Sequence, residues 1–344
     1  MKLPLVLAFA LAIISTSDEG GDQLAGSGRP GFSGDGGPAS QAVLDQPFDL
    51  VYNAAGDLYF SDTGNHRVRR IDAKTGAIST IAGNGEKGFA GDGGPATSAR
   101  LDEPYGLALD SAGDLFLADR LNRRIRRVDA KTGVISTVAG DGSNVSSGDG
   151  GPGAKAGIVE PNDVALDGRG RLFIADVAGH RVRVLDLATG TIATFAGDGR
   201  GRHAGDGGPA NAASLNGPRA LRIAPDGSLL ILERNGNTLR SVSPGGTIAT
   251  LAGDGTKGYS GDGGPAKEAS FDGPKELDVD ARGDLLIVDT ENNAVRRIDA
   301  ATGVVTTVAK GLARPHGVAF APDGASFVIG DTNHHQLRRV RSMP

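Results

Sequence analysis

One segment is repeated along almost the entire chain, and this repetition constrains the fold more than any other feature of the sequence. The segment at residues 101–157 is one copy, and the copies begin at Leu44, Leu101, Ile158, Leu215, Phe271 and Leu312. Successive starts lie about 57 residues apart, with a shorter last interval, which is in the range of four-stranded propeller blades. The repetition therefore predicts stacked units of one kind in a single closed domain.

Each unit contains four short runs that predict strands. In the second unit the runs cover residues 106–110, 114–118, 124–129 and 134–139. Each run is rich in leucine or β-branched residues and is bounded by glycine, asparagine or aspartate, which favour tight turns. Six such units predict an all-β fold, namely a six-bladed β-propeller of four-stranded blades.

The two ends of the chain hold complementary parts of a unit. Residues 22–42 match the tail of a unit, whereas the last unit, which starts at Leu312, lacks this tail. We therefore expect a strand near residues 23–25 to pair into the last blade, which closes the ring and removes free sheet edges.

An apolar run occupies residues 3–14, directly after the first lysine. It is too short to span a bilayer, which needs ~20 apolar residues, and it contains an Ala-Leu-Ala pattern of the kind found at cleavage sites. The run predicts a signal peptide over residues 1–17, a propeller over residues 18–344, and a secreted or periplasmic location. A first propeller strand is the alternative interpretation.

Composition and charge exclude several classes of function. The formal net charge of −5 disfavours a polyanionic partner, so no nucleic acid is expected. The chain has no cysteine, which removes disulfides, thiolate metal sites and a cysteine nucleophile. Its 55 glycines recur at turn positions, as expected for many short strands. We expect a monomer without a membrane span.

Three stretches within the units resemble the NHL repeat. They are GDLYFSDTGNHRVRRID at residues 56–72, GRLFIADVAGHRVRVLD at residues 170–186 and GDLLIVDTENNAVRRID at residues 283–299. The recurring GDGGPA insertion is similar to that of bacterial proteins whose propellers resemble the teneurin NHL propeller. The resemblance implies a six-bladed β-propeller, but it does not imply one activity, because one fold hosts many functions.

Each GDGGPA-type insertion contributes one aspartate, and these are Asp35, Asp92, Asp149, Asp206 and Asp262. A calcium loop is one interpretation, because Ca²⁺ binds several oxygen ligands. A single carboxylate per copy favours a second interpretation, in which the aspartate accepts hydrogen bonds from nearby backbone N–H groups and the glycines form a turn. We expect the structural turn.

Arginines crowd the third predicted strand of the units, as at Arg67, Arg69 and Arg70 in the first unit. The resemblance allows a phosphate-binding surface, because some NHL propellers of animal regulatory proteins bind RNA. Aspartates such as Asp72 lie nearby in the sequence and favour salt-bridged or solvated arginines. We expect the second arrangement.

The positions most informative about function are those at which the units differ. After the proline that opens each inner strand, the units carry the pairs Phe48-Asp49, Tyr105-Gly106, Asn162-Asp163, Arg219-Ala220, Lys275-Glu276 and His316-Gly317. Two positions further on, the fourth and fifth units carry Arg222 and Asp278 where the others have small residues. Six blades place these positions around one mouth of the axial channel. The predicted ligand-binding residues are Asp49, Tyr105, Asn162, Asp163, Arg219, Arg222, Lys275, Glu276, Asp278 and His316.

Three of these residues, Asp49, Asp163 and Glu276, come from alternate units and form a candidate metal site. Three carboxylates around one axis suit a hard cation such as Ca²⁺, which is the one cofactor that the pattern suggests. The alternative is a structural ring in which basic residues of the same mouth neutralise the acids. No catalytic residue is assigned, because the sequence has no G-x-S-x-G elbow or comparable signature.

These observations favour a secreted, non-enzymatic binding scaffold that recognises a protein, a glycan or a small ligand at the channel mouth. The alternative is a metal-dependent propeller enzyme, similar to amidating lyases, virginiamycin lyases or gluconolactonase-like hydrolases. The inner strands lack the several histidines expected of the zinc lyases, so the sequence favours the scaffold. A third interpretation is one portion of a cell-surface assembly.

Overall fold

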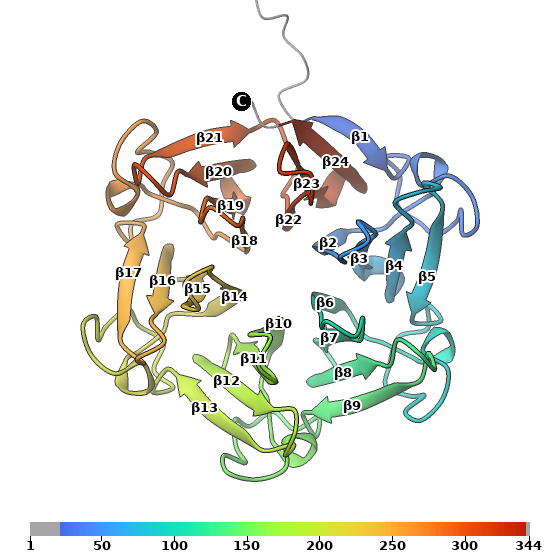
Figure 1. The fold of residues 1–344 in the computed structure, drawn as a ribbon, viewed down its shortest axis with the longest axis horizontal. Coiled ribbons are helices and arrows are strands. Elements are labelled where there is room, and N and C mark those ends of the chain that lie inside the picture. Colours follow the sequence, from blue (N-terminus) through green and yellow to red (C-terminus); the bar gives the residue numbers. More distant parts are fainter. Residues whose placement is uncertain (1–20, 342–344) are drawn as a thin grey trace, which may run out of the picture.

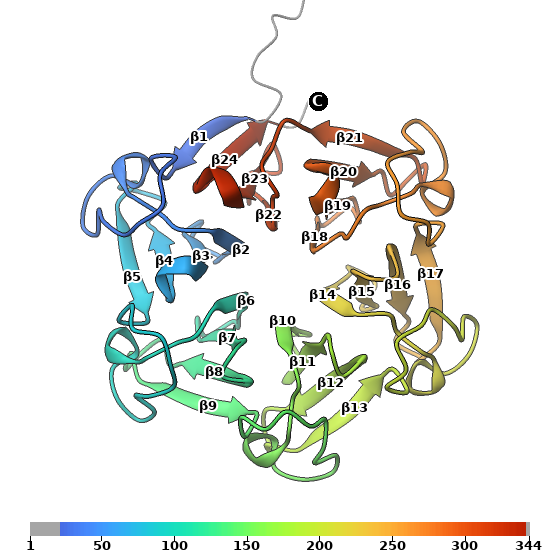
Figure 2. The ribbon, with the colours of Figure 1, turned by 180° about the vertical axis from the view of Figure 1, so that it is seen from behind.

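The protein is a ring of six sheets around a central axis (Figures 1 and 2). The computed structural model describes residues 21–341, and each sheet has four antiparallel strands. This arrangement confirms the predicted all-β, six-bladed β-propeller. The predicted signal peptide over residues 1–17 lies outside the described residues and stays a prediction.

The blades are numbered by the unit that forms them, and their strands are given from the axis outward. Blade 1 has β2 (Pro47–Tyr52), β3 (Leu58–Asp62), β4 (Arg67–Ile71) and β5 (Ile78–Ala82). Blade 2 has β6 (Pro104–Leu109), β7 (Leu115–Asp119), β8 (Arg124–Val128) and β9 (Ile135–Ala139). Blade 3 has β10 (Pro161–Leu166), β11 (Arg171–Asp176), β12 (Arg181–Asp186) and β13 (Ile192–Ala196).

The second half of the ring follows the same plan. Blade 4 has β14 (Pro218–Ile223), β15 (Leu229–Glu233), β16 (Thr238–Val242) and β17 (Ile248–Ala252). Blade 5 has β18 (Glu276–Val279), β19 (Leu285–Asp289), β20 (Ala294–Ile298) and β21 (Val305–Ala309). Blade 6 has β22 (Gly317–Phe320), β23 (Ser326–Asp331), β24 (Gln336–Arg341) and β1 (Asp22–Ala25).

The helices of residues 21–341 are short 3₁₀ turns of three residues. They are η1 (Ala39–Gln41), η2 (Thr63–Asn65), η3 (Ala96–Ser98), η4 (Gly153–Lys155), η5 (Ala210–Ala212), η6 (Ala266–Glu268), η7 (Thr290–Asn292) and η8 (Thr332–His334). None of these described helices has the length and apolar character needed to cross a membrane.

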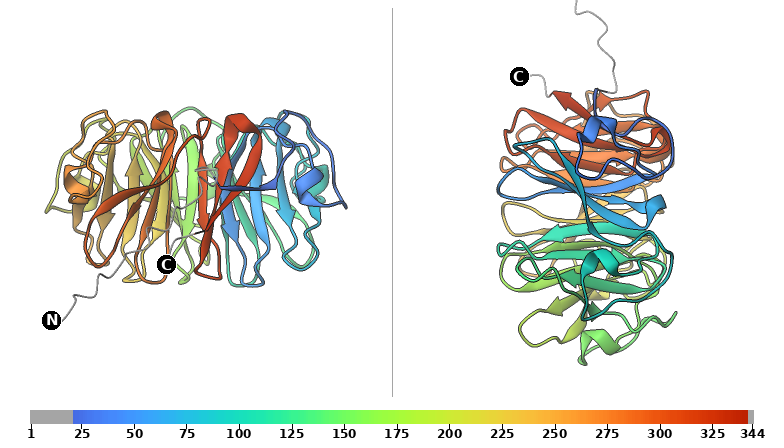
Figure 3. Two further views of the ribbon diagram at one scale, coloured as in Figure 1. Left: turned by 90° about the horizontal axis from the view of Figure 1, so that it is seen from above. Right: turned by 90° about the vertical axis from the view of Figure 1, so that its right-hand side faces the viewer.

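Strand order brings the start and the end of the described chain together. The inner strands surround the axis and the fourth strands form the rim (Figure 1), and the ring is flat when seen from its edge (Figure 3). β1 pairs antiparallel with β24 and becomes the rim strand of blade 6. The predicted closure by the N-terminal strand is therefore confirmed.

The turn between the third and fourth strands shows how local sequence shapes a blade. In blade 1, Asp72 Oδ1 accepts hydrogen bonds from the N–H groups of Lys74 and Thr75 and from the Thr75 hydroxyl, at 2.8–3.0 Å. Gly76 follows with a φ of 69°, a left-handed conformation that favours glycine. The same aspartate–threonine bond recurs in blades 2, 3 and 5. Repeated turn chemistry therefore fixes repeated hairpins.

The hydrophobic core lies between neighbouring blades. One cluster joins Phe173 and Val182 of blade 3 to Leu221 and Ile231 of blade 4. Equivalent clusters fill the other interfaces around the ring. Because each blade buries its apolar faces against two neighbours, closure of the ring completes the core.

The GDGGPA-type segments connect each blade to the next. The segment after β1 reaches the rim of blade 1, where Gly36 N–H donates to the Ile78 carbonyl at 2.8 Å and Ile78 N–H donates to the Gly37 carbonyl at 2.9 Å. Corresponding bonds occur at the rims of blades 2 to 5. Each segment is thus a tie between blades as well as a turn.

A buried arginine in the third strand holds the aspartate of each of these segments. In blade 1 the Arg69 guanidinium lies 2.7 Å from Asp35 and 3.4 Å from Asp62 of β3. The equivalent arginines in blades 2 to 5, all at most 1% exposed, are Arg126, Arg183, Arg240 and Arg296. Each contacts the aspartate of its own GDGGPA-type segment. We term this ion pair the rim latch. It shows that the buried arginine of the third strand is salt-bridged in blades 1 to 5.

Candidate functional site

The residues that differ between units form two layers around the axis. The first residue of each pair after the opening proline forms a mouth layer, which consists of Phe48, Tyr105, Asn162, Arg219, Lys275 and His316. The second residue lies one step further along the strand and faces the axis below that layer. The two layers have different chemistry, and each is described in turn.

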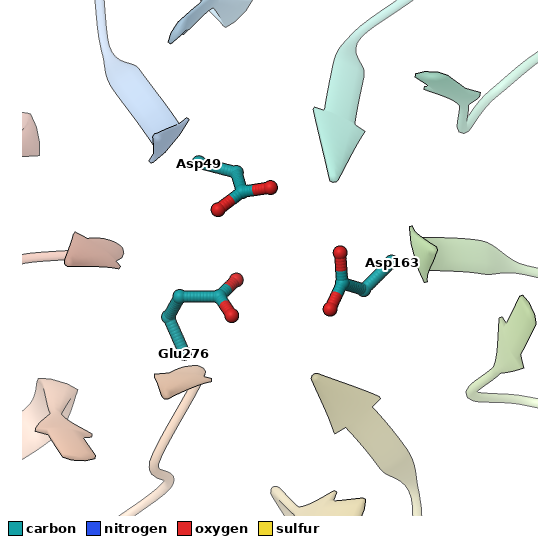
Figure 4. Close-up of side chains that lie close together, drawn as sticks. All are labelled: Asp49, Asp163 and Glu276. Carbon is teal, nitrogen blue, oxygen red and sulfur yellow. The ribbon is translucent and has the colours of Figure 1, made fainter. Parts of the chain in front are cut away.

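Three acids meet on the axis below the mouth layer. Asp49 on β2, Asp163 on β10 and Glu276 on β18 point toward one another (Figure 4). One carboxylate oxygen from each lies within 4.8 Å of the other two, and the three residues are at most 5% exposed. The intervening blades carry only glycine or alanine at this position. Alternate blades therefore supply acids, and the blades between them leave the necessary room.

Two of the small residues between the acids are glycines that no larger residue could replace without movement. A Cβ on Gly106 would lie 2.2 Å from Asp163 Oδ1 and 2.4 Å from Asp163 Cα. A Cβ on Gly317 would lie 1.8 Å from the Phe48 carbonyl oxygen. Both positions thus allow a close approach of the neighbouring blade.

The acids near the axis also connect neighbouring blades. Asp49, Asp163 and the nearby Asp278 of β18 each accept a backbone hydrogen bond from the following blade. Leu107 N–H donates to Asp49 at 2.6 Å, Leu221 N–H to Asp163 at 2.7 Å, and Phe320 N–H to Asp278 at 2.8 Å. These bonds tie blade 1 to blade 2, blade 3 to blade 4, and blade 5 to blade 6. The acids therefore contribute to the structure whatever else they bind.

A single guanidinium lies among these acids. Arg222 on β14 contacts Asp49 and Asp163 at 3.1 Å each, Glu276 at 3.3 Å and Asp278 at 3.4 Å. The Arg222 side chain is 15% exposed, so the contacts are largely shielded from water. We term these five residues the axial cluster. One positive charge among four carboxylates leaves an excess of negative charge on the axis.

The pKa values of the axial cluster reflect this excess. Burial raises the pKa of Asp163 to about 7; Arg222 opposes the shift and the charge of Asp49 adds to it. Burial, reinforced by Asp163 and Asp49, raises the pKa of Glu276 well above its usual value. Burial alone would lower the pKa of Arg222, but the surrounding carboxylates hold it well above its ordinary value. The arginine is charged, and Asp163 is partly protonated near pH 7.

The position of Arg222 tests the predicted metal site at Asp49, Asp163 and Glu276. Ca²⁺ binds oxygen ligands at about 2.3–2.6 Å. The Arg222 guanidinium already lies within 3.3 Å of one oxygen from each of the three acids. A divalent cation would compete with it for the same oxygens. As arranged, these residues agree with the structural alternative, in which a basic residue pairs with the acids, and the metal site stays a prediction.

Flat side chains close the channel mouth. Phe48 stacks on His316 with ring centroids 4.1 Å apart, and its ring also contacts Tyr105 at 4.5 Å. The Arg219 guanidinium lies 5.2 Å from the Tyr105 ring centroid and donates a hydrogen bond to Asn162 Oδ1. The space left among these residues is about 10 Å³, which is no larger than one water needs. A larger ligand must therefore rest on the mouth layer or displace part of it.

The mouth layer carries excess positive charge, opposite in sign to the axial cluster. Burial lowers the pKa of Lys275 to about 8; its hydrogen bond to Glu291 opposes the shift, and Arg219 and Arg314 add to it. Burial lowers the pKa of His316 well below its usual value, with further lowering by Lys275 and Arg219. The imidazole is therefore neutral at pH 7. A basic layer thus lies directly beside an acidic one.

The predicted ligand-binding residues fall into two groups. Asp49, Asp163, Arg222, Glu276 and Asp278 form the axial cluster, and Tyr105, Asn162, Arg219 and His316 lie in the mouth layer. Lys275 turns to the side, where its Nζ lies 2.8 Å from Glu291 Oε1. Phe48 is absent from the predicted set, although it occupies the same repeat position as Tyr105 and could have been found by aligning the units.

A family model and curated relatives match this chain. The model of the Teneurin NHL domain matches residues 81–147. SUPPRESSOR OF QUENCHING 1 of Arabidopsis thaliana is 28% identical over 308 residues, which cover 85% of this chain and 29% of that protein. NHL repeat-containing protein 2 of Bos taurus is 32% identical over 166 residues, which cover 45% of this chain and 23% of that protein.

Teneurin-4 of Mus musculus is 28% identical over 293 residues, which cover 71% of this chain and 10% of that protein. The sequence matches and the six four-stranded blades agree with one another. The chain is an NHL-repeat β-propeller. This NHL propeller spans less than a third of the length of each of these three relatives.

Solved structures share the ring at low sequence identity. An auxiliary nutrient binding protein from Bacteroides thetaiotaomicron has a TM-score of 0.65 at 15% identity, with 92% of this chain and 75% of that chain covered. A gluconolactonase from Xanthomonas campestris has a TM-score of 0.58 at 17% identity, with 87% and 86% covered. Virginiamycin B lyase from Staphylococcus aureus has a TM-score of 0.53 at 17% identity, with 86% and 80% covered. At these sequence identities the similarity shows only that this NHL propeller has the same fold as these three proteins.

Proposed function

We propose that this NHL propeller is a binding scaffold and not an enzyme, and that it recognises a protein, a glycan or a small ligand on its mouth layer. The observation that carries the proposal is that six blades place six different side chains at one repeat position around the mouth. The rim latch, by contrast, repeats the same pair of residue types in successive blades. Varied side chains on a rigid, repeated frame suit recognition.

The hydrogen bonding of the acids supports binding over catalysis. Asp49 accepts backbone hydrogen bonds on both carboxylate oxygens, and so does Asp163. A general base needs a carboxylate oxygen or a ring nitrogen within reach of the substrate proton. At the mouth, His316 Nδ1 donates to the Arg314 carbonyl oxygen at 2.9 Å, so only Nε2 of this ring keeps a lone pair.

A thermal-shift screen of soluble glycans, peptides and small metabolites tests the proposal. We expect a ligand that raises the melting temperature of the wild type, and a rise at least two-fold smaller in Tyr105→Ala and in Arg219→Gln. Arg169→Gln is the matched control, because Arg169 is exposed in the turn between β10 and β11, at the opposite end of the inner strand from the mouth. A ligand whose effect persists in both mouth variants would contradict mouth binding, and its turnover by the wild type would contradict a scaffold.

The second candidate function is a metal-dependent lyase or hydrolase, favoured by the three carboxylate oxygens within 4.8 Å. In such enzymes a divalent cation polarises a carbonyl group or activates water, and here Arg222 would first have to move away. Calorimetric titration of Ca²⁺ and Zn²⁺ into the wild type and the Asp163→Ala/Glu276→Ala variant separates the candidates. Binding heat from the wild type but not from the variant supports a metal enzyme. No binding heat from either protein excludes the metal-enzyme hypothesis.

We further propose that the protein is secreted or periplasmic and monomeric, on the basis of the apolar run at residues 3–14 and the closed ring. Mass spectrometry of the protein exported by its native host would give a mature N-terminus near residue 18. Light scattering would give the mass of one chain. An N-terminus that retains Met1 would contradict the predicted cleavage.

A further inference from the structure

A cavity of about 360 Å³ opens between blades 4 and 5, beside the mouth layer. Its walls come from the turn between β15 and β16, the segment after β17, the segment that leads into β18, the turn after β19 and the segment that leads into β22. Apart from one glycine, every residue of the wall is polar or charged. The volume falls in the range of small-molecule sites, which is about 300–1,000 Å³.

The cavity exists because two repeat positions hold small residues at this interface. At the turn between β15 and β16, Asn237 has a φ of 51°, and histidines occupy the same position with the same conformation in blades 1, 3 and 6. In blade 6, His335 Nδ1 accepts a hydrogen bond from Gln46 N–H at 3.2 Å. Asn237 accepts the equivalent bond from Gly273 N–H at 2.9 Å. The shorter asparagine and the absent side chain of Gly273 leave the space unfilled.

Cations outnumber carboxylates around this cavity. The wall contains Arg234, Lys257, Lys275 and Arg314 against Asp272 and Glu291. One oxygen of Glu291 is shared, because it lies 2.8 Å from Lys275 Nζ and 2.9 Å from Arg314 Nη2. Lys257 contacts Asp272 at 3.4 Å, and its side chain is 75% exposed. These two carboxylates leave the cavity with two uncompensated positive charges.

The remaining cations have too few counter-charges in the folded protein. Within residues 21–341, Arg234 forms no ion pair with a carboxylate, and its Nε donates to Asn235 Oδ1 at 3.1 Å. The Lys275 side chain is only 6% exposed. Burial lowers the pKa of Lys275 to about 8, and the neighbouring Arg219 and Arg314 lower it further. A buried cation among other cations gains stability from an added anion.

We propose that this cavity binds a small oxyanion, namely a carboxylate- or phosphate-bearing molecule with a charge near −2, held by Arg234, Arg314 and Lys275. Guanidinium groups match carboxylate and phosphate oxygens with two parallel N–H bonds, and an ammonium adds a point charge. The inference rests on the proposed binding function and deepens it, because it names the class of ligand and the place beside the mouth where the anionic group sits.

Calorimetric titration of malonate and of inorganic phosphate at pH 7 and low salt tests the inference. We expect the wild type to bind at least one of them, and the stronger of the two identifies the carboxylate or the phosphate as the source. Arg234→Gln should weaken binding at least 10-fold. Asn237→His with Gly273→Gln copies the His335–Gln46 pair, fills the cavity and should abolish binding. Arg169→Gln, with the same loss of charge far from the cavity, should bind as the wild type does.

No heat from either anion with the wild type would overturn the oxyanion site, and so would unchanged binding by the cavity-filling variant. Arg234→Gln, checked for folding by thermal melting, keeps the test decisive if the double variant does not fold. A ligand from the mouth screen that still binds the cavity-filling variant, together with no binding of malonate or phosphate to the wild type, would overturn the oxyanion site and support the mouth site. Anion binding without any Tyr105-dependent ligand would support the oxyanion site and overturn the mouth site.

Discussion

The rim latch and the axial cluster use the same residue types, a buried arginine and carboxylates, but the cluster has more carboxylates for its one arginine. In the latch of blade 2, Arg126 lies 2.7 Å from Asp92, which is 38% exposed, and 3.1 Å from the fully buried Asp119. In the axial cluster, one arginine contacts four carboxylates, all at most 20% exposed. The latch has one hydrated acid for each buried one, whereas the cluster has an excess of buried negative charge.

This difference follows from where each group sits in the ring. Blades 1 to 5 each receive a GDGGPA-type segment at the rim, so the latch recurs in these five blades. All blades share one axis, so six non-identical contributions produce one cluster there. Repeated positions therefore hold the ring together, and positions around the axis are the place where one propeller can differ chemically from another.

The largest effect is expected from Arg222→Gln at pH 8, because it leaves four buried acids without a guanidinium. We expect the free energy of unfolding in urea to fall by about 5 kcal/mol. Burial raises the pKa of Asp163 to about 7 in the folded protein, so the stability that its protonated form provides at low pH is lost as the pH rises through 7. At pH 5 the loss should therefore be much smaller. An equal loss at both pH values would refute the excess of negative charge.

Arg126→Ala in the rim latch should have the next largest effect, a loss of about 3 kcal/mol, because it leaves Asp119 buried and unpaired. Arg127 is the adjacent residue, its side chain is 42% exposed, and it pairs with Asp114. Arg127→Ala should cost less than about 1 kcal/mol. Urea unfolding at pH 7 compares the two variants. Similar losses would mean that the latch has no special role in stability.

Glu276→Gln should stabilise the protein at pH 8 by roughly 1–2 kcal/mol, because it removes one surplus charge from the axial cluster. Glutamine keeps the oxygen that accepts a hydrogen bond from Leu277 N–H at 3.1 Å. Burial raises the pKa of Glu276 well above its usual value, so the stability of the protonated form is lost as the pH rises, and the gain from glutamine should vanish near pH 4.

Unfolding free energies measured from pH 4 to pH 8 check this dependence. The exposed Glu268→Gln supplies the control and should leave the pH profile unchanged. A glutamine variant less stable than the wild type at pH 8 would show that Glu276 is a needed anion.

The smallest effect is expected in blade 3, where the hydrogen bonding around the latch is incomplete. In blade 1, Asn65 Nδ2 donates to Asp62 at 2.9 Å, but blade 3 has Gly179 at this position. Asp176 Oδ2 is buried there and has no hydrogen-bond partner among the described residues. Gly179→Asn should raise the free energy of unfolding by about 1 kcal/mol once Asp176 turns to accept the new bond.

Gly179→Ala is the matched control for this change. A Cβ at Gly179 would lie 2.2 Å from Asp176 Oδ2, so alanine imposes the same shift without offering a donor. We expect alanine to lower the free energy of unfolding in the same urea titration. A gain from both substitutions would mean that backbone entropy, and not the missing hydrogen bond, limits this blade.

Much of the fold could be predicted because each unit carries its own turn signals. The predicted run at residues 124–129 corresponds to β8 (Arg124–Val128), and the complementary chain ends predicted the pairing of β1. Because the blades are alike, residues at the same position of each repeat lie at similar distances from the axis. For that reason the approach of Asp49, Asp163 and Glu276 could also be anticipated.

Contacts between units were harder to predict. Arg222 contacts the acids whereas Arg219 contacts Asn162, and the repeat positions alone did not show which of these two arginines would reach the acids. The rim latch had a usable signal, because its partners lie 34 residues apart in every copy, as in Asp35 and Arg69. The cavity between blades 4 and 5 depends on two positions in different units, which periodicity alone does not bring together.

The central claim is that recurring residues hold the ring and that singular residues around its mouth bind the ligand. The most direct test measures the melting temperature of Arg126→Ala and Arg219→Gln with and without the ligand recovered by the thermal-shift screen. We predict that Arg126→Ala melts earlier but keeps the ligand-induced rise, whereas Arg219→Gln melts near the wild type and loses it. The reverse pattern would contradict the claim.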